Sequence, residues 1–324
     1  MTLGGARQVA TFYRFVAIDD PAGFRRELLN RGEALRLEGT VLLAREGLNA
    51  TVAGTEASLR SFTNWLLADP RFHGMVIKWS TLPEGSRAFL RFKVKIKEEV
   101  VTLGQGAVAV DETQAERASP EQWHALLDDP TVRVIDVRNR YEVEAGTFRG
   151  AEDPQTTSFR EFPEYIKESC GTDRQQTLAI FCTGGIRCEK AAAFLRQEGF
   201  ARVVQLDGGI LNYLEAVPED DNRWQGECFV FDQRVTVDAE LNPGGHVQCH
   251  ACRRPVSVAG QRSAAYVAGV SCPACIGAKH DDERERYAER MRQVALADAR
   301  GATHLGPQRQ EPQDIQRQSK QPDG

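Results

Sequence analysis

The sequence contains no apolar run of about 18 residues, which is the length that a membrane-spanning helix needs. Its first seven residues also lack the apolar core of a signal peptide. We therefore expect a cytoplasmic protein that has no membrane partner. In that reducing compartment, the eight cysteines are better explained by catalysis or metal binding than by disulfide bonds.

The sequence also lacks an excess of positive charge. A formal net charge of −5 excludes a surface that attracts nucleic acid everywhere, so an RNA partner would need a local basic patch, and we expect no DNA partner. No nucleotide motif, flavin fingerprint, haem motif or 2-His-1-carboxylate set is present. The apolar and charged contents, 41% and 27%, are those of ordinary globular proteins, and 324 residues suffice for two to three domains.

The most informative stretch is a strand, a tight loop and a helix in succession. The apolar residues 178–181 predict the strand, Cys182 is the first loop residue, and the pattern at 191–195 predicts the helix. Two glycines allow the loop N–H groups to point inward as an anion-binding nest beside the positive end of the helix dipole. We therefore expect a thiolate of lowered pKa at Cys182, and at Arg187 a fixed positive charge that could orient an anionic or polar substrate. The expected backbone donors of the loop are Thr183, Gly184, Gly185 and Ile186.

Both cysteines of this stretch have alternative interpretations. Cys182 could be a small buried hydrophobe at a strand end, as free cysteines often are. The flanking glycines, the arginine and the change from strand to helix favour the reactive thiolate. Cys188, one turn into the helix, could resolve a disulfide or simply pack.

The first 100 residues alternate strand and helix patterns. Strand-like stretches surround two helical ones and lie at 12–18, 39–44, 50–54 and 75–80. Asp20 and Pro21 open the first helix, which should run to about residue 37, and Thr55 caps the second. The order β-α-β-β-α-β is that of the ferredoxin-like split unit, so we expect a ferredoxin-like (acylphosphatase-like) α+β domain over residues 1–100.

A row of basic residues ends this domain. From residue 91 onward the cations occupy odd positions of a predicted strand, so one strand face is cationic and the other apolar. The row could bind the phosphates of RNA, or it could be the solvated edge strand that natural sheets use against aggregation. The candidate RNA-binding residues are Arg87, Arg91, Lys93, Lys95 and Lys97.

After a connector at 101–118, residues 119–224 alternate strands with helices, which predicts an α/β domain with a parallel sheet covered on both faces. Sites in such sheets lie beyond the carboxyl ends of the strands. Asp136 and Arg138 fall there beside Cys182, so we take them, with Cys188, as candidate supporting residues.

Two cysteine pairs follow in a small module at 225–280. The spacing C-x2-C, nineteen residues, C-x2-C is typical of a zinc ribbon, although two coincidental dithiol pairs or a disulfide knuckle would share it. Four thiolates would fill a zinc ion and leave no open catalytic position, so a bound zinc would be structural. The candidate ligands are Cys249, Cys252, Cys272 and Cys275. Residues 281–324 are a charged tail, which we expect to be disordered beyond a short helix.

The central domain resembles a rhodanese domain, whose hallmark is a cysteine at the start of the active-site loop. The longer string Cys182–Lys190 is more specific and resembles the bacterial tRNA uridine(34) hydroxylases, the TrhO family. Three further strings share that resemblance: Arg45–Asn49, Arg160–Pro163 and Cys228–Asp232. It covers residues from about 10 to 276 and implies a ferredoxin-like domain, a rhodanese-like domain and a cysteine-rich extension, here with fewer cysteines than in many relatives.

The resemblance implies an enzyme that acts on tRNA with O2 as co-substrate, an oxidoreductase that hydroxylates C5 of the wobble uridine. It makes Cys182 the essential cysteine, as a thiolate or a persulfide. Two other interpretations stay open: a sulfurtransferase that passes persulfide sulfur to a small acceptor, and a non-enzymatic RNA-binding adaptor. The basic row and the additional N-terminal domain favour the RNA-modifying enzyme, because a small acceptor needs neither. The oligomeric state is not indicated by the sequence.

Overall fold

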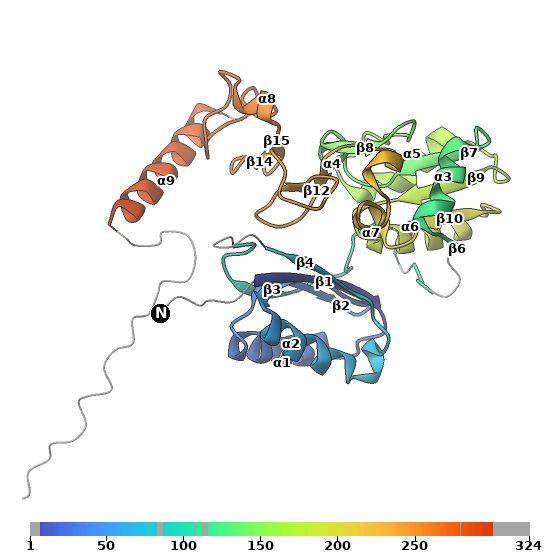
Figure 1. Ribbon diagram of the computed structural model, residues 1–324, viewed down its shortest axis with the longest axis horizontal. Helices are drawn as coiled ribbons and strands as arrows, with labels where there is room; N and C mark the ends of the chain where they lie inside the picture. Colours follow the sequence, from blue (N-terminus) through green and yellow to red (C-terminus); the bar gives the residue numbers. More distant parts are fainter. Residues whose placement is uncertain (1–6, 83–86, 107, 112–115, 279, 301–324) are drawn as a thin grey trace, which may run out of the picture.

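The computed structural model describes residues 7–82, 87–106, 108–111, 116–278 and 280–300, and Figure 1 shows how they are arranged. The N-terminal part is a five-stranded sheet in the order β4-β1-β3-β2-β5. The first four strands have the ferredoxin-like topology that the sequence predicted, and β5 adds to β2 in parallel at the edge. The elements are β1 (Arg7–Phe15), α1 (Pro21–Ala34), β2 (Glu38–Ala44), β3 (Gly47–Thr55), α2 (Glu56–Leu67), η1 (Pro70–Phe72), β4 (Ile77–Thr81) and β5 (Phe92–Ile96).

The two helices of this domain begin at side-chain caps. The Asp20 side chain accepts a hydrogen bond from the Gly23 N–H, and Thr55 accepts one from Ser58, so both predicted starts are confirmed. The helix α1 ends at Ala34, before the expected residue 37. The first strand, β1, lies earlier than the expected 12–18.

The helices α1 and α2 cover one face of the sheet and leave the other toward the rest of the chain (Figure 1). Alternate residues of each strand, such as Phe12 and Val94, pack into the core beneath the helices. The residues between them, such as Tyr13 and Lys95, therefore belong to the opposite face, which we call the open face.

The central part is a four-stranded parallel sheet in the order β6-β10-β9-β7 with a separate apolar core on each face. The sequence prediction of a doubly covered parallel sheet is thus confirmed. The elements are β6 (Glu116–Ala118), α3 (Pro120–Asp128), β7 (Val132–Asp136), α4 (Arg140–Val143), β8 (Gly146–Phe148), η3 (Phe159–Glu161), α5 (Phe162–Cys170), β9 (Thr177–Phe181), α6 (Ile186–Gln197), β10 (Val203–Leu206), α7 (Gly209–Ala216) and η4 (Glu219–Asp221).

The expected connector, 101–118, is not a simple linker. Its last residues form β6, an edge strand of the parallel sheet. Leu103 and Val108 are buried in the core beside α5 and α6. The central domain therefore begins inside the segment that the sequence pattern had left between domains, because isolated apolar residues carry no periodic signal.

The C-terminal part consists of short hairpins and two helices. The strand β11 (Trp224–Gly226) pairs with β8 and ties the segment to the central domain. The hairpins are β12 (Cys228–Phe229) with β13 (Thr236–Val237), and β14 (Val247–Gln248) with β15 (Pro255–Val256); the helices are α8 (Val258–Gln261) and α9 (Asp281–Ala299). The short helix expected at the start of the tail is α9, which runs to Ala299, while residues 301–324 lie outside the described part. Among the described helices, none is long and apolar enough to cross a membrane.

The open face of the N-terminal sheet packs against the first turns of α6. The Lys190 side chain is completely buried and donates to both oxygens of Glu46 at 2.8 and 2.9 Å, to Glu99, and to the Val101 carbonyl. At the preceding position of α6, Glu189 accepts a hydrogen bond from the Tyr13 hydroxyl at 3.1 Å. These contacts join the two domains at the helix that follows Cys182.

Candidate active site

Cys182 follows β9 directly and is almost completely buried, with 1% of its surface exposed. The Gly185 N–H donates to its sulfur at 3.2 Å. Burial alone would raise the pKa of Cys182, but hydrogen bonds from Cys188 and Gly185 and the positive charge of Arg187 lower it to about 5. At neutral pH this sulfur is therefore a thiolate.

The cysteine loop is held against a second loop, between β10 and α7. The Ile210 N–H donates to the Cys182 carbonyl at 3.0 Å, and the Leu211 N–H donates to the Thr183 carbonyl at 3.1 Å. Gly209 is needed for this approach, because a Cβ there would lie 2.4 Å from the Cys182 carbonyl oxygen. Of the four expected loop residues, Gly185 directs its N–H at the sulfur, while the Thr183 hydroxyl donates to the Phe229 carbonyl.

Arg187 is fixed by a partner that the sequence did not identify. Its two terminal nitrogens each donate to one oxygen of Glu142 at 2.7 Å, and both side chains are buried. Burial would lower the pKa of Arg187, but Glu142 and the Cys182 thiolate raise it above its ordinary value. Arg187 thus supplies positive charge to the thiolate, and its fork of donors is already occupied by a carboxylate.

The candidate supporting residues have different surroundings. Cys188 is completely buried, and burial together with its bond to Cys182 raises its pKa, so its thiol remains a proton donor. Asp136 and Arg138 form a fully buried ion pair, with Arg138 also donating to the Gly146 carbonyl and lying 5.1 Å from the ring centroid of Trp224. That pair holds the β7–β8 region together and does not line the cavity described next.

A cavity of about 670 Å³ lies between the open face of the N-terminal sheet, the cysteine loop and the start of the C-terminal part. Cys182 and Arg187 line it from the central domain, and Tyr13 and Asn49 line it from the sheet. The segment after β12 closes a third side with Val230, Phe231 and Asp232. The thiolate is therefore at a site that two domains and the C-terminal segment build together.

Two residues of the open face support the loop and were missed by the sequence analysis. Lys78 donates to the carbonyls of Gly184 and Gly208; burial lowers its pKa, and the charge of Cys182 acts in the opposite direction. A Cβ at Gly185, where φ is +102°, would lie 2.8 Å from the Tyr13 hydroxyl. Only the tertiary fold brings these positions together, so no local pattern could have indicated them.

The basic row belongs to the same open face. The register pairs Lys93 with Thr40 and Lys95 with Leu42, and both partners line the cavity, as does Lys97. Burial lowers the pKa of Lys93, and the positive charges of Arg91, Lys95 and Arg253 lower it further. Because Arg253 belongs to the cysteine module, cations from two parts of the chain gather here.

Arg87 differs from the rest of the row. It lies before β5 and donates to Glu38 at 2.8 Å and to the Leu90 carbonyl. Its charge is thus already paired with a carboxylate on β2.

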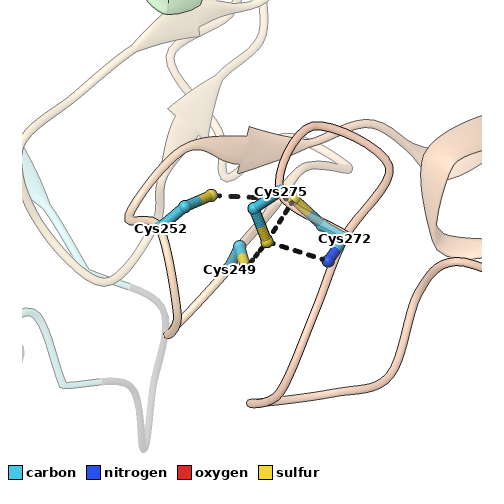
Figure 2. Close-up of side chains that lie close together, drawn as sticks. All are labelled: Cys249, Cys252, Cys272 and Cys275. Atoms are coloured by element: carbon cyan, nitrogen blue, oxygen red, sulfur yellow. Dashed lines mark hydrogen bonds between the residues drawn. The ribbon is translucent and has the colours of Figure 1, made fainter. Parts of the chain in front are cut away.

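The four candidate ligands of the cysteine module converge from two loops (Figure 2). All four sulfur atoms lie within 4.8 Å of one another, with separations of 3.9 Å for Cys249–Cys275, 3.7 Å for Cys252–Cys272 and 3.6 Å for Cys272–Cys275. A tetrahedron with metal–sulfur bonds of about 2.3 Å has edges of about 3.8 Å. The donor set and its spacing therefore fit a tetrahedral metal ion.

Comparison with known proteins assigns both domains. Residues 7–100 match the model described as the UPF0176 acylphosphatase like domain, and residues 119–216 match the rhodanese-like domain. Proteins named tRNA uridine(34) hydroxylase from Acaryochloris marina and Sinorhizobium fredii are each 46% identical, over 91% and 92% of this chain and 94% of theirs. One from Gluconobacter oxydans is 47% identical, over 92% of this chain and 96% of its own.

The lowered pKa of Cys182 predicts how its alkylation depends on pH. The iodoacetamide rate should be at its plateau at pH 7 and should fall below about pH 5, where the thiolate is protonated. Arg187→Ala removes a positive charge, so it should move the midpoint to higher pH. We expect no change in Arg140→Ala, whose arginine pairs with Glu144 at the surface. An unchanged midpoint in Arg187→Ala, measured against a Cys182→Ser blank, would contradict the role of Arg187.

The cysteine module should depend on a metal ion. A chelator is expected to release about one equivalent of metal and to lower the melting temperature, and Cys249→Ser should lower it similarly. Cys170→Ser is the control, because Cys170 lies on α5, outside the cluster. Freshly purified protein without metal, and with four titratable thiols in the module, would refute the site.

Proposed function

The chain belongs to the tRNA uridine(34) hydroxylase family, and we propose that it catalyses the oxygen-dependent 5-hydroxylation of the uridine at position 34 of tRNA. The observation that carries this proposal is the thiolate of Cys182 in a cavity lined by the open face of the N-terminal sheet. We further propose that the enzyme works in the cytoplasm, where tRNA is modified.

The thiolate can activate the pyrimidine by adding to its C6 atom. This addition places electron density on C5, which then bonds to O2 to give a C5 peroxide. Two external thiols reduce the peroxide to a hydroxyl group, forming a disulfide and water. Loss of the C5 proton and expulsion of the Cys182 thiolate restore the C5–C6 double bond. The net reaction consumes one O2 and two thiols for each hydroxyl group formed.

The surrounding residues favour this chemistry. The Gly185 N–H and the Arg187 charge hold the thiolate before addition and receive it again after expulsion. Cys188 remains protonated and donates to the same sulfur. Since Glu142 occupies the Arg187 donors, we assign Arg187 to the thiolate and not to a substrate phosphate.

A persulfide on Cys182 could use the same loop donors, so sulfur transfer is the alternative chemistry of this site. The cavity volume weighs against it. About 670 Å³ exceeds what cyanide or a small thiol would fill, and it lies in the range of pockets that hold nucleotide-sized ligands. The lining contributed by the N-terminal sheet has no evident purpose for a small acceptor.

We propose that the basic row, without the paired Arg87, holds the tRNA phosphates. The phosphate-binding residues are then Arg91, Lys93, Lys95 and Lys97. These side chains share the open face with the cavity, and Lys97 lines it. Burial lowers the Lys93 pKa and repulsion by the neighbouring cations lowers it further, and this repulsion is relieved when an anion binds between them. Arg253 of the cysteine module would join this surface.

We propose zinc as the metal of the cysteine module. Cys249, Cys252, Cys272 and Cys275 would hold it as four thiolates, which leaves no position for water or substrate. The zinc ion would hold the module in one conformation and so fix Arg253, which directly follows the ligand Cys252. It would not take part in hydroxylation.

The function is tested with purified protein, unmodified tRNA, air and a thiol reductant. Nucleoside mass spectrometry should show one oxygen atom added to the wobble uridine, and no product without oxygen. Cys182→Ser should lower the rate by roughly a thousandfold or more, because the hydroxyl cannot replace the thiolate. The matched control is Cys170→Ser, with near-normal activity. Full activity of Cys182→Ser, or sulfur incorporation in place of oxygen, would count against the proposal.

The basic row is tested by the salt dependence of tRNA binding. Neutralising Lys93 and Lys95 with glutamine should weaken binding to all tRNAs alike and flatten the log–log salt slope by between one and two units, because two phosphate contacts are lost. The control exchanges two exposed cations on other surfaces, Arg26 on α1 and Lys167 on α5. If both double variants keep the wild-type slope, β5 is an ordinary solvated edge strand.

A further inference from the structure

Phe231 is an exception among the phenylalanines of this chain. It is 58% exposed, whereas every other phenylalanine is buried or partly buried. It also lines the same cavity as Cys182 and Arg187. An aromatic ring that stays exposed on a cavity wall, beside a nucleophile, indicates a surface that a planar ligand covers.

The exposed ring is firmly held. It packs edge-to-face on Phe229, with ring centroids 5.1 Å apart, and Phe229 packs edge-to-face on Tyr141 at 5.3 Å. The next residue, Asp232, binds Arg234, which donates to the Ser80 hydroxyl of β4 at 3.2 Å. The wall segment is thus anchored to the central domain on one side and to the N-terminal sheet on the other.

The charges around the ring suit an RNA ligand. The exposed side chains of Lys97 and Arg160 line the same cavity. Single-stranded RNA is held in this way, with phosphates on cations and unstacked bases on aromatic rings. A paired base could not reach a buried sulfur, so the ligand must be a nucleotide outside a duplex.

We propose that Phe231 is the stacking platform for the target pyrimidine, which leaves the stack of its RNA loop and lies on this ring while its C6 atom faces Cys182. The inference rests on the proposed function and adds a positioning residue to it. Phe231 does not take part in bond formation; it fixes the plane of the base and favours bases that are free of a helix.

The inference predicts that the base itself contributes to binding through Phe231. In a Cys182→Ala background, where no chemistry follows, an anticodon stem-loop RNA with the target uridine is compared with one that is abasic at that position. Stacking of one base corresponds to about 5- to 150-fold in affinity. With Phe231 present, the abasic RNA should bind more weakly than the uridine RNA by a factor in this range. Phe231→Leu should remove most of the difference in affinity between the two RNAs. Phe231→Trp should keep that difference.

Two measurements separate this role from a structural one. The alkylation rate of Cys182 and the melting temperature should be unchanged in Phe231→Leu made in the otherwise wild-type chain, and its loss of hydroxylation should appear mainly as a raised KM. The control is Val76→Ala, because Val76 is 72% exposed and lies outside the cavity lining. If Phe231→Leu misfolds, Phe231→Trp with its retained base dependence provides the test.

The outcomes distinguish the two proposals. If the wild-type protein hydroxylates the stem-loop and Phe231→Leu shows the same KM and the same preference for uridine over the abasic site, the stacking platform is wrong and the enzyme assignment stands. If the wild-type protein neither binds nor hydroxylates the stem-loop, the proposed function is wrong, and so is the stacking role of Phe231.

Discussion

The burial of Lys190 is the constraint on which the rest of the site depends. A fully buried ammonium group must be compensated, and breaking such an arrangement by removing one partner typically costs about 3–5 kcal/mol. Its partners, Glu46 and Glu99, both precede the rhodanese-like domain. The helix that follows Cys182 therefore keeps its charge balance only when the N-terminal sheet is docked. Docking in turn places Tyr13 and Lys78 against the cysteine loop and forms one wall of the cavity.

This contact between the N-terminal sheet and α6 explains why several separate strings of the sequence carry the family resemblance. The string Arg45–Asn49 supplies Glu46 to Lys190 and Asn49 to the cavity. The string Cys182–Lys190 supplies the thiolate and both charged residues that meet the N-terminal domain. The string Cys228–Asp232 forms the third wall. Each string is short, but together they specify one composite site.

Local signals were sufficient for much of the architecture. The caps at Asp20 and Thr55, the strand–cysteine–helix succession and the spacing of the two cysteine pairs depend on neighbouring residues, so the sequence could indicate them. Glu142 beneath Arg187 is a contact across 45 positions and left no such pattern. Asp136 ends β7 and Arg138 follows it, as expected, yet their side chains bind each other. The alternation at residues 91–97 predicted one cationic face, but only the register with β2 shows that this face adjoins the cavity.

The hydrogen bonds from Ile210 and Leu211 to the cysteine loop have a consequence for the newly made protein. Domains fold from the N-terminus during synthesis, so the ferredoxin-like sheet is complete long before the ribosome reaches β10. Until Ile210 and Leu211 have been made, the two hydrogen bonds that hold the cysteine loop cannot form, so the loop is not yet fixed in its final position. At translation rates of roughly 5–20 residues per second, synthesis of the chain from Cys182 to Leu211 takes roughly 1.5 to 6 seconds. The cysteine loop thus reaches its final position late in synthesis, against a surface that has already folded.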